Sequence, residues 1–274
     1  MAEQAKERTQ GSGKPDYTIH AVQNALRVLK AFKTDPTGLT LTDISTAAGL
    51  SKSMTLRNLF TLEKEGFVSY DPDKKKYTLG LELFELGNAR FNSISWRKIA
   101  TKKLRKLSND TGMICYLGVR EEQKIVMLEK IFPITTPTWA QLMVQTGGTS
   151  EMYSTGIGRL FLSRYTEEEL EAYFRQISLQ SFTTTTIVDK AELLEIIRRA
   201  GEEDIAYNMG ENEVYIHSIC CPIFDNTGTM IAGISICGMQ DVIEGEDRPK
   251  YVALLKATAD AISREIGYRS DAEN

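Results

Sequence analysis

The sequence predicts an α+β protein in which a small N-terminal module of helices and a hairpin is joined by a helical linker to a larger α/β domain with a mostly antiparallel sheet. Three observations favour this division. Helical spacing of apolar residues dominates residues 18–80, whereas helical and strand-like patterns mix beyond them. The same segment carries nine Lys and Arg against six Asp and Glu, in a chain of net charge −4. With 274 residues, 42% of them hydrophobic, the chain can bury one or two cores.

These patterns divide the chain into four expected segments. They are a flexible tail over residues 1–17, a basic module over 18–80, a linker helix over 81–94 and a larger domain over 95–270. No run approaches the roughly 20 apolar residues of a membrane span, and the N-terminus is polar rather than a signal sequence. We therefore expect a cytoplasmic protein with no membrane partner.

The cysteines are too few and too irregularly spaced for a disulfide framework, and they occur in apolar strand-like runs. A cytoplasmic location also favours free thiols. We expect all four to be reduced: Cys115, Cys220, Cys221 and Cys237.

The first helix of the basic module is expected over residues 19–32, where Val22, Leu26, Leu29 and Phe32 recur at helical spacing. A stretch that contains Pro and Gly then ends it. This helix presents an amphipathic surface.

A short second helix is expected just after that break. Thr40 or Thr42 can cap its start, and Gly49 supplies its C-terminal break. Only a few residues separate Gly49 from the next helix, so the turn between the two helices is tight.

A third helix opens at Ser51 or Ser53 and runs to about Glu65. Its apolar side chains can point inward: Met54, Leu59, Leu62 and Phe67. Its polar side chains are expected on the outer face: Lys52, Ser53, Thr55, Arg57 and Asn58. A helix that only fills a core does not need such a polar face.

Two strand-like runs, residues 66–70 and 77–80, are joined by a turn that contains Lys74, Lys75 and Lys76. Three helices followed by this hairpin form a winged helix-turn-helix. The spacing suits DNA because the major groove admits one helix, which the preceding helix must cross through a tight turn. Lysines on the hairpin tip can meet phosphate and add salt-dependent affinity.

The larger domain mixes both kinds of element. Helices are expected over residues 96–112, 154–165, 166–177, 189–203 and 249–268. Strands are expected over residues 113–119, 124–132 and 138–144, and a hairpin over residues 214–225 and 229–239.

The whole layout resembles the IclR family of bacterial transcription regulators. Residues 50–87 are similar to the family's recognition helix, wing and linker, residues 154–174 to its glycine turn and acidic helix, and residues 219–238 to its paired strands. The likeness runs from about Thr18 to Tyr268. It implies a GAF-like effector-binding domain after the winged helix, a double-stranded DNA operator as partner, and no enzymatic activity or cofactor.

The resemblance makes the third helix a recognition helix. Arg57 and Asn58 are natural bidentate partners for guanine and adenine. Which side chains meet bases and which meet phosphates stays open. The expected DNA-binding residues are Lys52, Ser53, Thr55, Arg57, Asn58, Lys74, Lys75 and Lys76.

The resemblance also implies an effector pocket, lined by Gly156, Ile157, Asn208, Ile216, Ser218, Ser235 and Cys237. A helix start rich in Gly exposes N–H groups suited to a carboxylate, so a small organic acid is the expected effector. Strand alternation puts Ser235 and Cys237 on one face. Aromatic walls are expected from Trp139, Tyr153 and Tyr207, unless these are ordinary core residues.

Four positions depart from the family pattern. Many members have an acidic residue at Asn208, a Gly at Tyr215, a Cys at Ser218 and a Lys at Arg159. These changes leave the ligand open, and Tyr215 either fills part of the pocket or faces solvent.

An enzyme is the first alternative. The two histidines are His20, which lies in the basic module, and His217, which has no obvious orienting acid. A metal site from His217, Cys237 and Cys115 is conceivable, but the ligands lack the close pairing of zinc sites, so no metal is expected.

The second alternative is a DNA-binding scaffold whose larger domain only oligomerises. A homodimer or a dimer of dimers is expected in either case, because two winged helices bind paired half-sites. Ligand-dependent operator affinity distinguishes a sensor from a scaffold. The sequence leaves open the operator, the effector and the sign of regulation.

Overall fold

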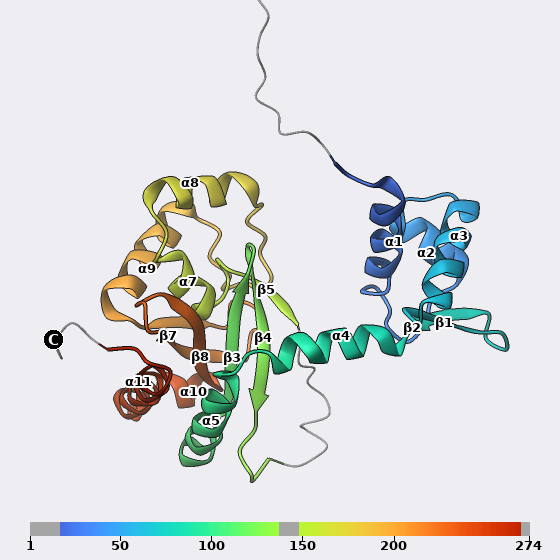
Figure 1. Ribbon diagram of the computed structural model, residues 1–274. Helices are drawn as coiled ribbons and strands as arrows, with labels where there is room; N and C mark the ends of the chain where they lie inside the picture. The colour runs from blue at the N-terminus through green and yellow to red at the C-terminus, as the bar shows by residue number, and fades with distance from the viewer. Residues whose placement is uncertain (1–16, 137–147, 270–274) are drawn as a thin grey trace, which may run out of the picture. The chain divides into compact units, whose positions relative to one another are not determined.

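The computed structural model describes residues 17–136 and 148–269 and divides the chain into two compact units, Met1–Ser93 and Ile94–Asn274 (Figure 1). All but one residue of the tail expected over 1–17 lies outside the described residues, as does the strand expected over 138–144. Within the described ranges, no helix is both long and apolar enough to cross a membrane.

The N-terminal unit contains helices and a two-stranded antiparallel sheet in the order predicted for a winged helix-turn-helix. Thr40 caps α2 through a capping box, and Ser51 caps α3 by accepting the Met54 N–H. Gly49 ends α2 with φ 65°, a left-handed conformation that glycine adopts without strain. The elements are α1 (His20–Ala31), α2 (Leu41–Ala48), α3 (Lys52–Lys64), β1 (Val68–Asp71), β2 (Lys76–Leu79) and α4 (Leu81–Asn92).

One hydrophobic core holds this unit together. Phe32 from α1, Ile44 from α2 and Leu59 from α3 are among its buried residues, and Tyr77 from β2 joins them. Leu59 and Leu62 point inward as predicted, whereas the expectation for Met54 was wrong because its side chain is 43% exposed. The core therefore orients α3 with one face inward and the rest of its surface open.

The C-terminal unit is built on an antiparallel sheet with strand order β5-β4-β3-β8-β7-β6. Its strands are β3 (Ile114–Glu121), β4 (Lys124–Ile131), β5 (Thr149–Glu151), β6 (Ala206–Met209), β7 (His217–Phe224) and β8 (Met230–Gly238). Its helices are α5 (Arg97–Thr111), α7 (Gly156–Leu162), α8 (Glu167–Gln176), α9 (Lys190–Glu203), α10 (Gln240–Ile243) and α11 (Arg248–Glu265).

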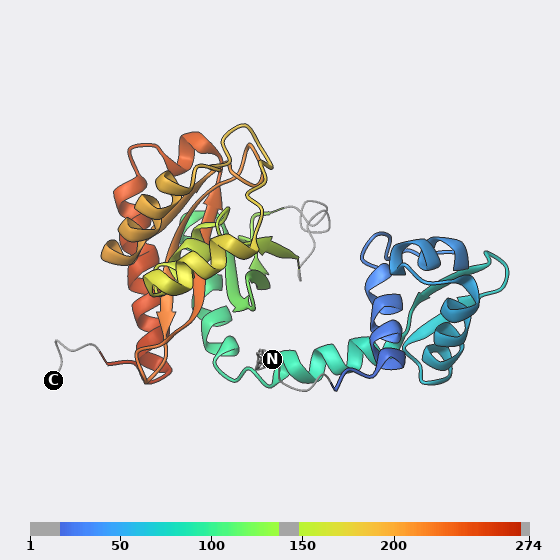
Figure 2. The same cartoon turned by 90° about the horizontal axis from the view of Figure 1, so that it is seen from above.

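Helices cover both faces of this sheet (Figure 2). On one face, α5 and α11 pack against Leu117, Ile219 and Ile234. On the other, α7, α8 and α9 build a second core that includes Cys220. Since side chains alternate along a strand, Cys220 and Cys221 lie on opposite faces, as the sequence predicted. All four cysteines are free and buried.

The short elements β5, β6 and α10 were not predicted. Strands β5 and β6 have three and four residues, too few for period-two alternation to stand out. They matter because β6 carries Asn208 and β5 lies just before the glycine turn.

Candidate functional site

The exposed face of α3 is the first candidate site. Lys52, Ser53 and Arg57 are exposed there, as the sequence predicted. Ser51 fixes the start of the helix through its cap, so these side chains come from the first two turns. The first turn contains no acidic residue. The positive charges of Lys52 and Arg57 suit this surface to contact with the phosphate backbone of a DNA duplex.

Two residues assigned to that face are placed differently. The expectation that Thr55 lies on it was wrong: Thr55 is 0% exposed, and its hydroxyl donates to the Ser51 carbonyl at 3.0 Å. Asn58 is half-buried and donates its amide to the Met54 carbonyl at 2.8 Å. Thr55 lies four residues before Leu59 and seven before Leu62, so it shares their core-facing side of α3, which polarity alone did not reveal.

The hairpin tip is the second part of this surface. Lys74 is exposed and pairs with Asp71 at 3.3 Å, and Lys75 is exposed in the turn with φ 53°. Lys76 was wrongly placed on the tip, because it begins β2 and is half-buried. Lys74 and Lys75 are therefore more accessible to a DNA phosphate than Lys76 is.

A cavity of about 210 Å³ opens between the sheet and α7 in the C-terminal unit. All seven residues expected around the effector line it: Gly156, Ile157, Asn208, Ile216, Ser218, Ser235 and Cys237. The sheet register explains the convergence, since Ser218 stands opposite Cys237 and Ser235 opposite both Cys220 and Tyr116. Burial raises the pKa of Cys237 to about 11, so its thiol is neutral at pH 7.

The sequence did not reveal the charged and aromatic part of this lining. Lys130, Glu213 and Tyr116 belong to it. The Lys130 ammonium lies 4.9 Å from the centre of the Tyr116 ring, and burial lowers the pKa of Lys130, against the opposing effect of the Glu213 charge. A lysine near the end of a mostly apolar strand was the available signal, but its face depends on strand register.

Both units of the chain match models of known protein families. A family model described as "IclR helix-turn-helix domain" matches residues 21–72, and one described as "Bacterial transcriptional regulator IclR C-terminal" matches residues 89–264. The chain belongs to the IclR family of bacterial transcriptional regulators. The IclR family thus accounts for both a DNA-binding unit and an effector-binding unit.

Individual relatives agree with the IclR assignment. The HTH-type transcriptional regulator XynR of Escherichia coli (strain K12) is 29% identical, over 91% of this chain and 98% of its own length. The crystal structure of an IclR regulator from Alicyclobacillus acidocaldarius has a TM-score of 0.77 at 29% identity, covering 90% of this chain and 99% of that one. Such relatives are named as regulators rather than as enzymes.

A second IclR structure contains a ligand. The homolog from Microbacterium hydrocarbonoxydans, solved in complex with 4-hydroxybenzoate, has a TM-score of 0.75 and covers 90% of this chain and 98% of that one. Its identity to this chain is 21%, so the likeness extends to the fold alone.

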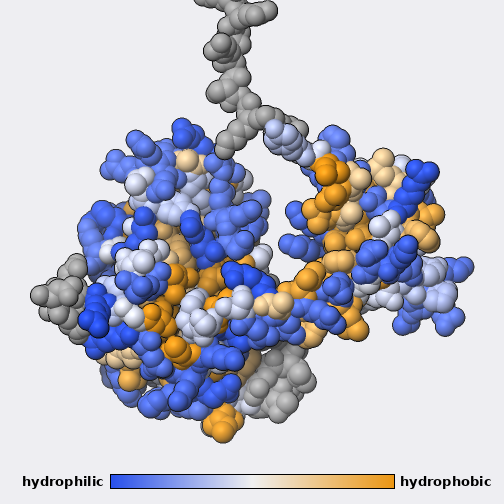
Figure 3. Space-filling view, viewed as in Figure 1, coloured by the Kyte–Doolittle hydropathy of each residue, from blue (hydrophilic) through white to orange (hydrophobic). Residues whose placement is uncertain are grey.

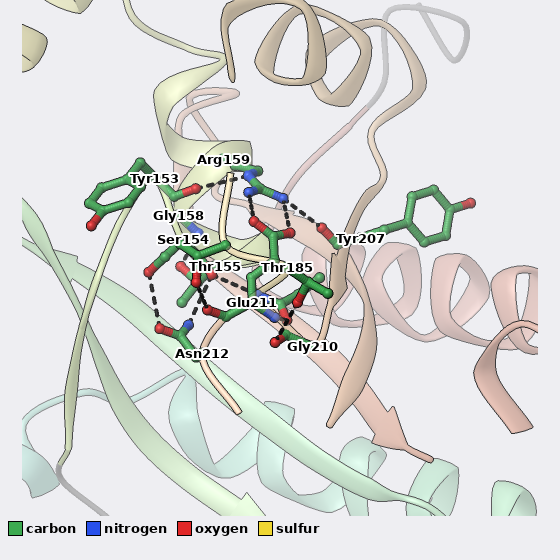
Figure 4. A network of polar contacts seen from close by, with 12 residues as sticks. Tyr153, Ser154, Thr155, Gly158, Arg159, Thr185, Tyr207, Gly210, Glu211 and Asn212 are labelled. Atoms are coloured by element: carbon green, nitrogen blue, oxygen red, sulfur yellow. Dashed lines mark hydrogen bonds and ion pairs between the residues drawn. The ribbon is translucent and has the colours of Figure 1, made fainter. Parts of the chain in front are cut away.

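Arg159, one of the departures from the IclR pattern, does not line the cavity, and its guanidinium points toward Glu211 (Figure 4). The Arg159 side chain is 1% exposed and forms a bidentate ion pair with Glu211, in which Nη1 lies 2.7 Å from Oε1. Its guanidinium also donates to the carbonyls of Tyr153 and Tyr207, at 2.9 and 3.1 Å. Arg159 therefore joins α7 to the loop after β6.

Asn208, a second departure, reinforces the same junction. Its amide donates to the Ser154 carbonyl at 2.6 Å, and its carbonyl oxygen accepts the Glu211 N–H at 3.2 Å. Asn212 also donates to the Ser154 carbonyl, at 2.9 Å (Figure 4). Asn208 thus lines the cavity while its amide holds the loop that forms one wall.

The remaining departures are Tyr215 and Ser218, and the aromatic residues expected near the cavity are Trp139, Tyr153 and Tyr207. Tyr215 is 74% exposed and does not line the cavity, so it faces solvent. Tyr153 and Tyr207 do not line it either, so the expected aromatic wall was wrong for both. Trp139 lies outside the described residues. Ser218 lines the cavity, and its hydroxyl is 3.7 Å from the Cys220 sulfur.

His217 points away from the cavity, since it alternates with Ser218 along β7. Contrary to the sequence-based expectation, it has an acidic neighbour: its Nδ1 lies 2.8 Å from Glu244 Oε1, although the two are not aligned as a hydrogen bond. Within residues 17–136 and 148–269, no three or more His, Cys, Asp and Glu side chains are arranged to hold a metal ion.

Proposed function

We propose that this IclR-family regulator reads a duplex operator with α3 and the hairpin wing, and that a small organic acid in the C-terminal cavity changes its operator affinity. The observation that carries the proposal is the cavity, because it joins an apolar interior to hydroxyl groups and the Lys130 ammonium. Its volume of about 210 Å³ is below the roughly 300–1,000 Å³ of pockets for drug-sized ligands, so a small metabolite fits best.

Lys130 supports an anionic ligand. Partial burial makes an ammonium group costly unless an opposite charge joins it, and Glu213 is the lining carboxylate near it. A ligand carboxylate would add a second partner. The glycine-rich helix start contributes less than the sequence suggested, because the Thr155 hydroxyl already accepts the Gly158 N–H at 3.1 Å.

A thermal-shift screen of small carboxylic acids tests the ligand class. An acid at about 100 times its dissociation constant should stabilise the protein by roughly 2.7 kcal/mol. The methyl ester of each hit should give a smaller shift, and Lys130→Met should respond weakly to the acid. Lys250→Met, which removes an exposed lysine of the same unit, is the matched control and should respond like wild type.

Filling the cavity tests its location. Ser218→Leu combined with Ser235→Leu should abolish the thermal shift and the ligand's effect on DNA binding, while DNA binding without ligand persists. If the double variant still responds, the cavity is not the effector site. If no acid or neutral metabolite shifts the wild type, the scaffold alternative is the better description.

Selection from random duplexes tests the DNA-binding part. We expect an enriched site with two related half-sites, because paired winged helices contact two turns of one duplex face. Recovery of no enriched site would contradict sequence-specific binding. We expect the regulator in the cytoplasm, because bacterial chromosomal DNA lies there. Its activity is then the binding of DNA and effector rather than catalysis.

A second copy of the chain is the proposed occupant of an apolar surface on the N-terminal unit. Figure 3 shows apolar residues gathered over α1 and α4, and the exposed ones include Val22, Leu26, Leu81 and Phe84. Covering this surface in a homodimer would also supply the paired recognition helices. Light scattering should show a dimer or tetramer, and Leu26→Glu with Phe84→Glu should weaken it, whereas Ile134→Glu, an exposed site in the other unit, should not.

A further inference from the structure

The exposed face of α3 carries two apolar side chains that the proposed function does not yet explain. Phe60 is 69% exposed and Leu56 is 49% exposed. They are four residues apart in one helix, so they are neighbours on its surface. The core-facing side of α3 is formed by other residues, since its buried side chains are Thr55, Leu59 and Leu62.

The pair lies among the groups that suit DNA. At about 100° per residue, Phe60 and Leu56 point between Ser53 and Lys52 and within one turn of Arg57. The side of α3 that meets α1 is elsewhere: Met54, whose sulfur is 3.3 Å from the Asn24 amide, lies about 120° around the helix from Phe60. Leu56 and Phe60 thus form an apolar patch with the cationic side chains of Lys52 and Arg57 beside it. A DNA groove presents the same pattern, with base edges between two rows of phosphates, and a protein core does not.

The major groove offers such a side chain one kind of apolar group. Base edges there display hydrogen-bond donors, acceptors and the 5-methyl group of thymine. We propose that Phe60, supported by Leu56, contacts thymine methyl groups and so determines which operator bases the regulator prefers. This inference rests on the proposed reading of DNA by α3, and it goes further by naming the base and the chemical group that are read.

Replacing thymine by deoxyuridine tests the contact, because it removes the methyl group and leaves the hydrogen-bonding edge unchanged. The probe is the duplex recovered from random-sequence selection, with each thymine of one half-site replaced in turn. Wild type should lose affinity by about fourfold at one or two of these positions, the size expected for a buried methyl group. Phe60→Ala should bind the thymine and uridine duplexes equally at those positions.

Tyr215→Ala removes an equally exposed aromatic side chain from the other unit and should keep the wild-type uridine response. Phe60→Leu should keep part of it, because an apolar side chain remains. The proposal is overturned if the selected half-site has no preferred thymine, if no uridine weakens wild-type binding, or if Phe60→Ala keeps the full uridine response. It is also overturned if Phe60→Ala changes the oligomeric state without changing the uridine response. Failure to select any site would instead contradict the proposed DNA binding itself.

Discussion

Arg159 and Glu211 form a bidentate ion pair, and both side chains are almost completely buried. The pair joins α7, whose first residues line the cavity, to the loop after β6, which forms another part of its lining. The hydroxyl of Thr186 also donates to the Glu211 carbonyl, at 2.6 Å. The cavity is thus shaped by a network that lies behind it, and its shape depends on charged groups that do not line it.

Removing one member of this pair should be costly. Arg159→Met leaves the Glu211 carboxylate buried without its partner, so the free energy of unfolding should fall by about 3–5 kcal/mol in urea denaturation. Arg159→Met with Glu211→Leu should recover most of this loss, because no buried charge remains. Arg198→Met, which breaks exposed ion pairs on α9, should leave the stability nearly unchanged. Equal losses in the single and double variants would contradict this account.

Two glycines in helices should respond oppositely to substitution by alanine. A Cβ at Gly158 would lie 2.2 Å from the Met152 carbonyl oxygen, which is backbone and cannot move aside, so Gly158→Ala should cost about 2 kcal/mol or more. A Cβ at Gly87 meets nothing within 4 Å, so Gly87→Ala should stabilise α4 by about 0.5–1 kcal/mol. Thermal and urea unfolding would measure both, and a stable Gly158→Ala variant would show that the helix start can shift.

Thr55 and Arg57 should separate stability from base reading. Thr55→Ala removes a buried methyl group and a hydrogen bond, so it should lower the stability of the N-terminal unit by about 1–2 kcal/mol and leave the selected DNA sequence unchanged. Arg57→Ala should leave stability unchanged and cost about 1–3 kcal/mol of binding to the cognate site. A changed base preference in Thr55→Ala would contradict the burial of that side chain.

The wing lysines should differ in their effect on the salt dependence of binding. Lys75→Ala removes an exposed charge and should reduce the slope of log affinity against log salt by about 1. Lys76→Ala should change the slope less, because Lys76 is half-buried. Hydrogen bonds from Thr40, and more weakly the charge of Lys76, lower the pKa of Asp43. Equal slopes for the two variants would contradict this difference.

The thiols should be inert in the folded protein. Burial raises the pKa of Cys237 to about 11 and that of Cys221 to about 12, and it raises those of Cys115 and Cys220 as well. A coloured disulfide reagent at pH 8 should therefore react slowly with native protein and quickly with all four cysteines after unfolding.

The raised thiol pKa values also set a pH dependence. The folded state holds these protons more tightly than the unfolded state does, so their contribution to stability is complete below pH 9, the ordinary pKa. The contribution of Cys237 is lost as the pH rises from there through about 11. Cys237→Ser should flatten the fall in unfolding free energy between pH 9 and 11, and an unchanged fall would assign it to other groups.

The sequence by itself determined the order of the longer helices and strands and many of the residues of both surfaces, although it missed β5, β6 and α10 and the Lys130 side of the cavity. Caps at Thr40 and Ser51, the break at Gly49 and apolar periodicity are local signals, because each depends on residues within one or two turns. The seven cavity residues followed from a family resemblance, and strand alternation placed Ser235 and Cys237 together. Local signals, strand alternation and the family resemblance were therefore enough to predict these features.

Tertiary structure decided which face each side chain occupies and what lies opposite it. Thr55 is buried and Phe60 is exposed because the neighbouring helices select one side of α3, and periodicity alone does not favour either. Lys130 reaches the cavity through the register between β3 and β4, where a shift of one residue would turn it to the other face. Arg159 meets Glu211 across 52 residues of chain, a pairing that only the packing of α7 against β6 can create.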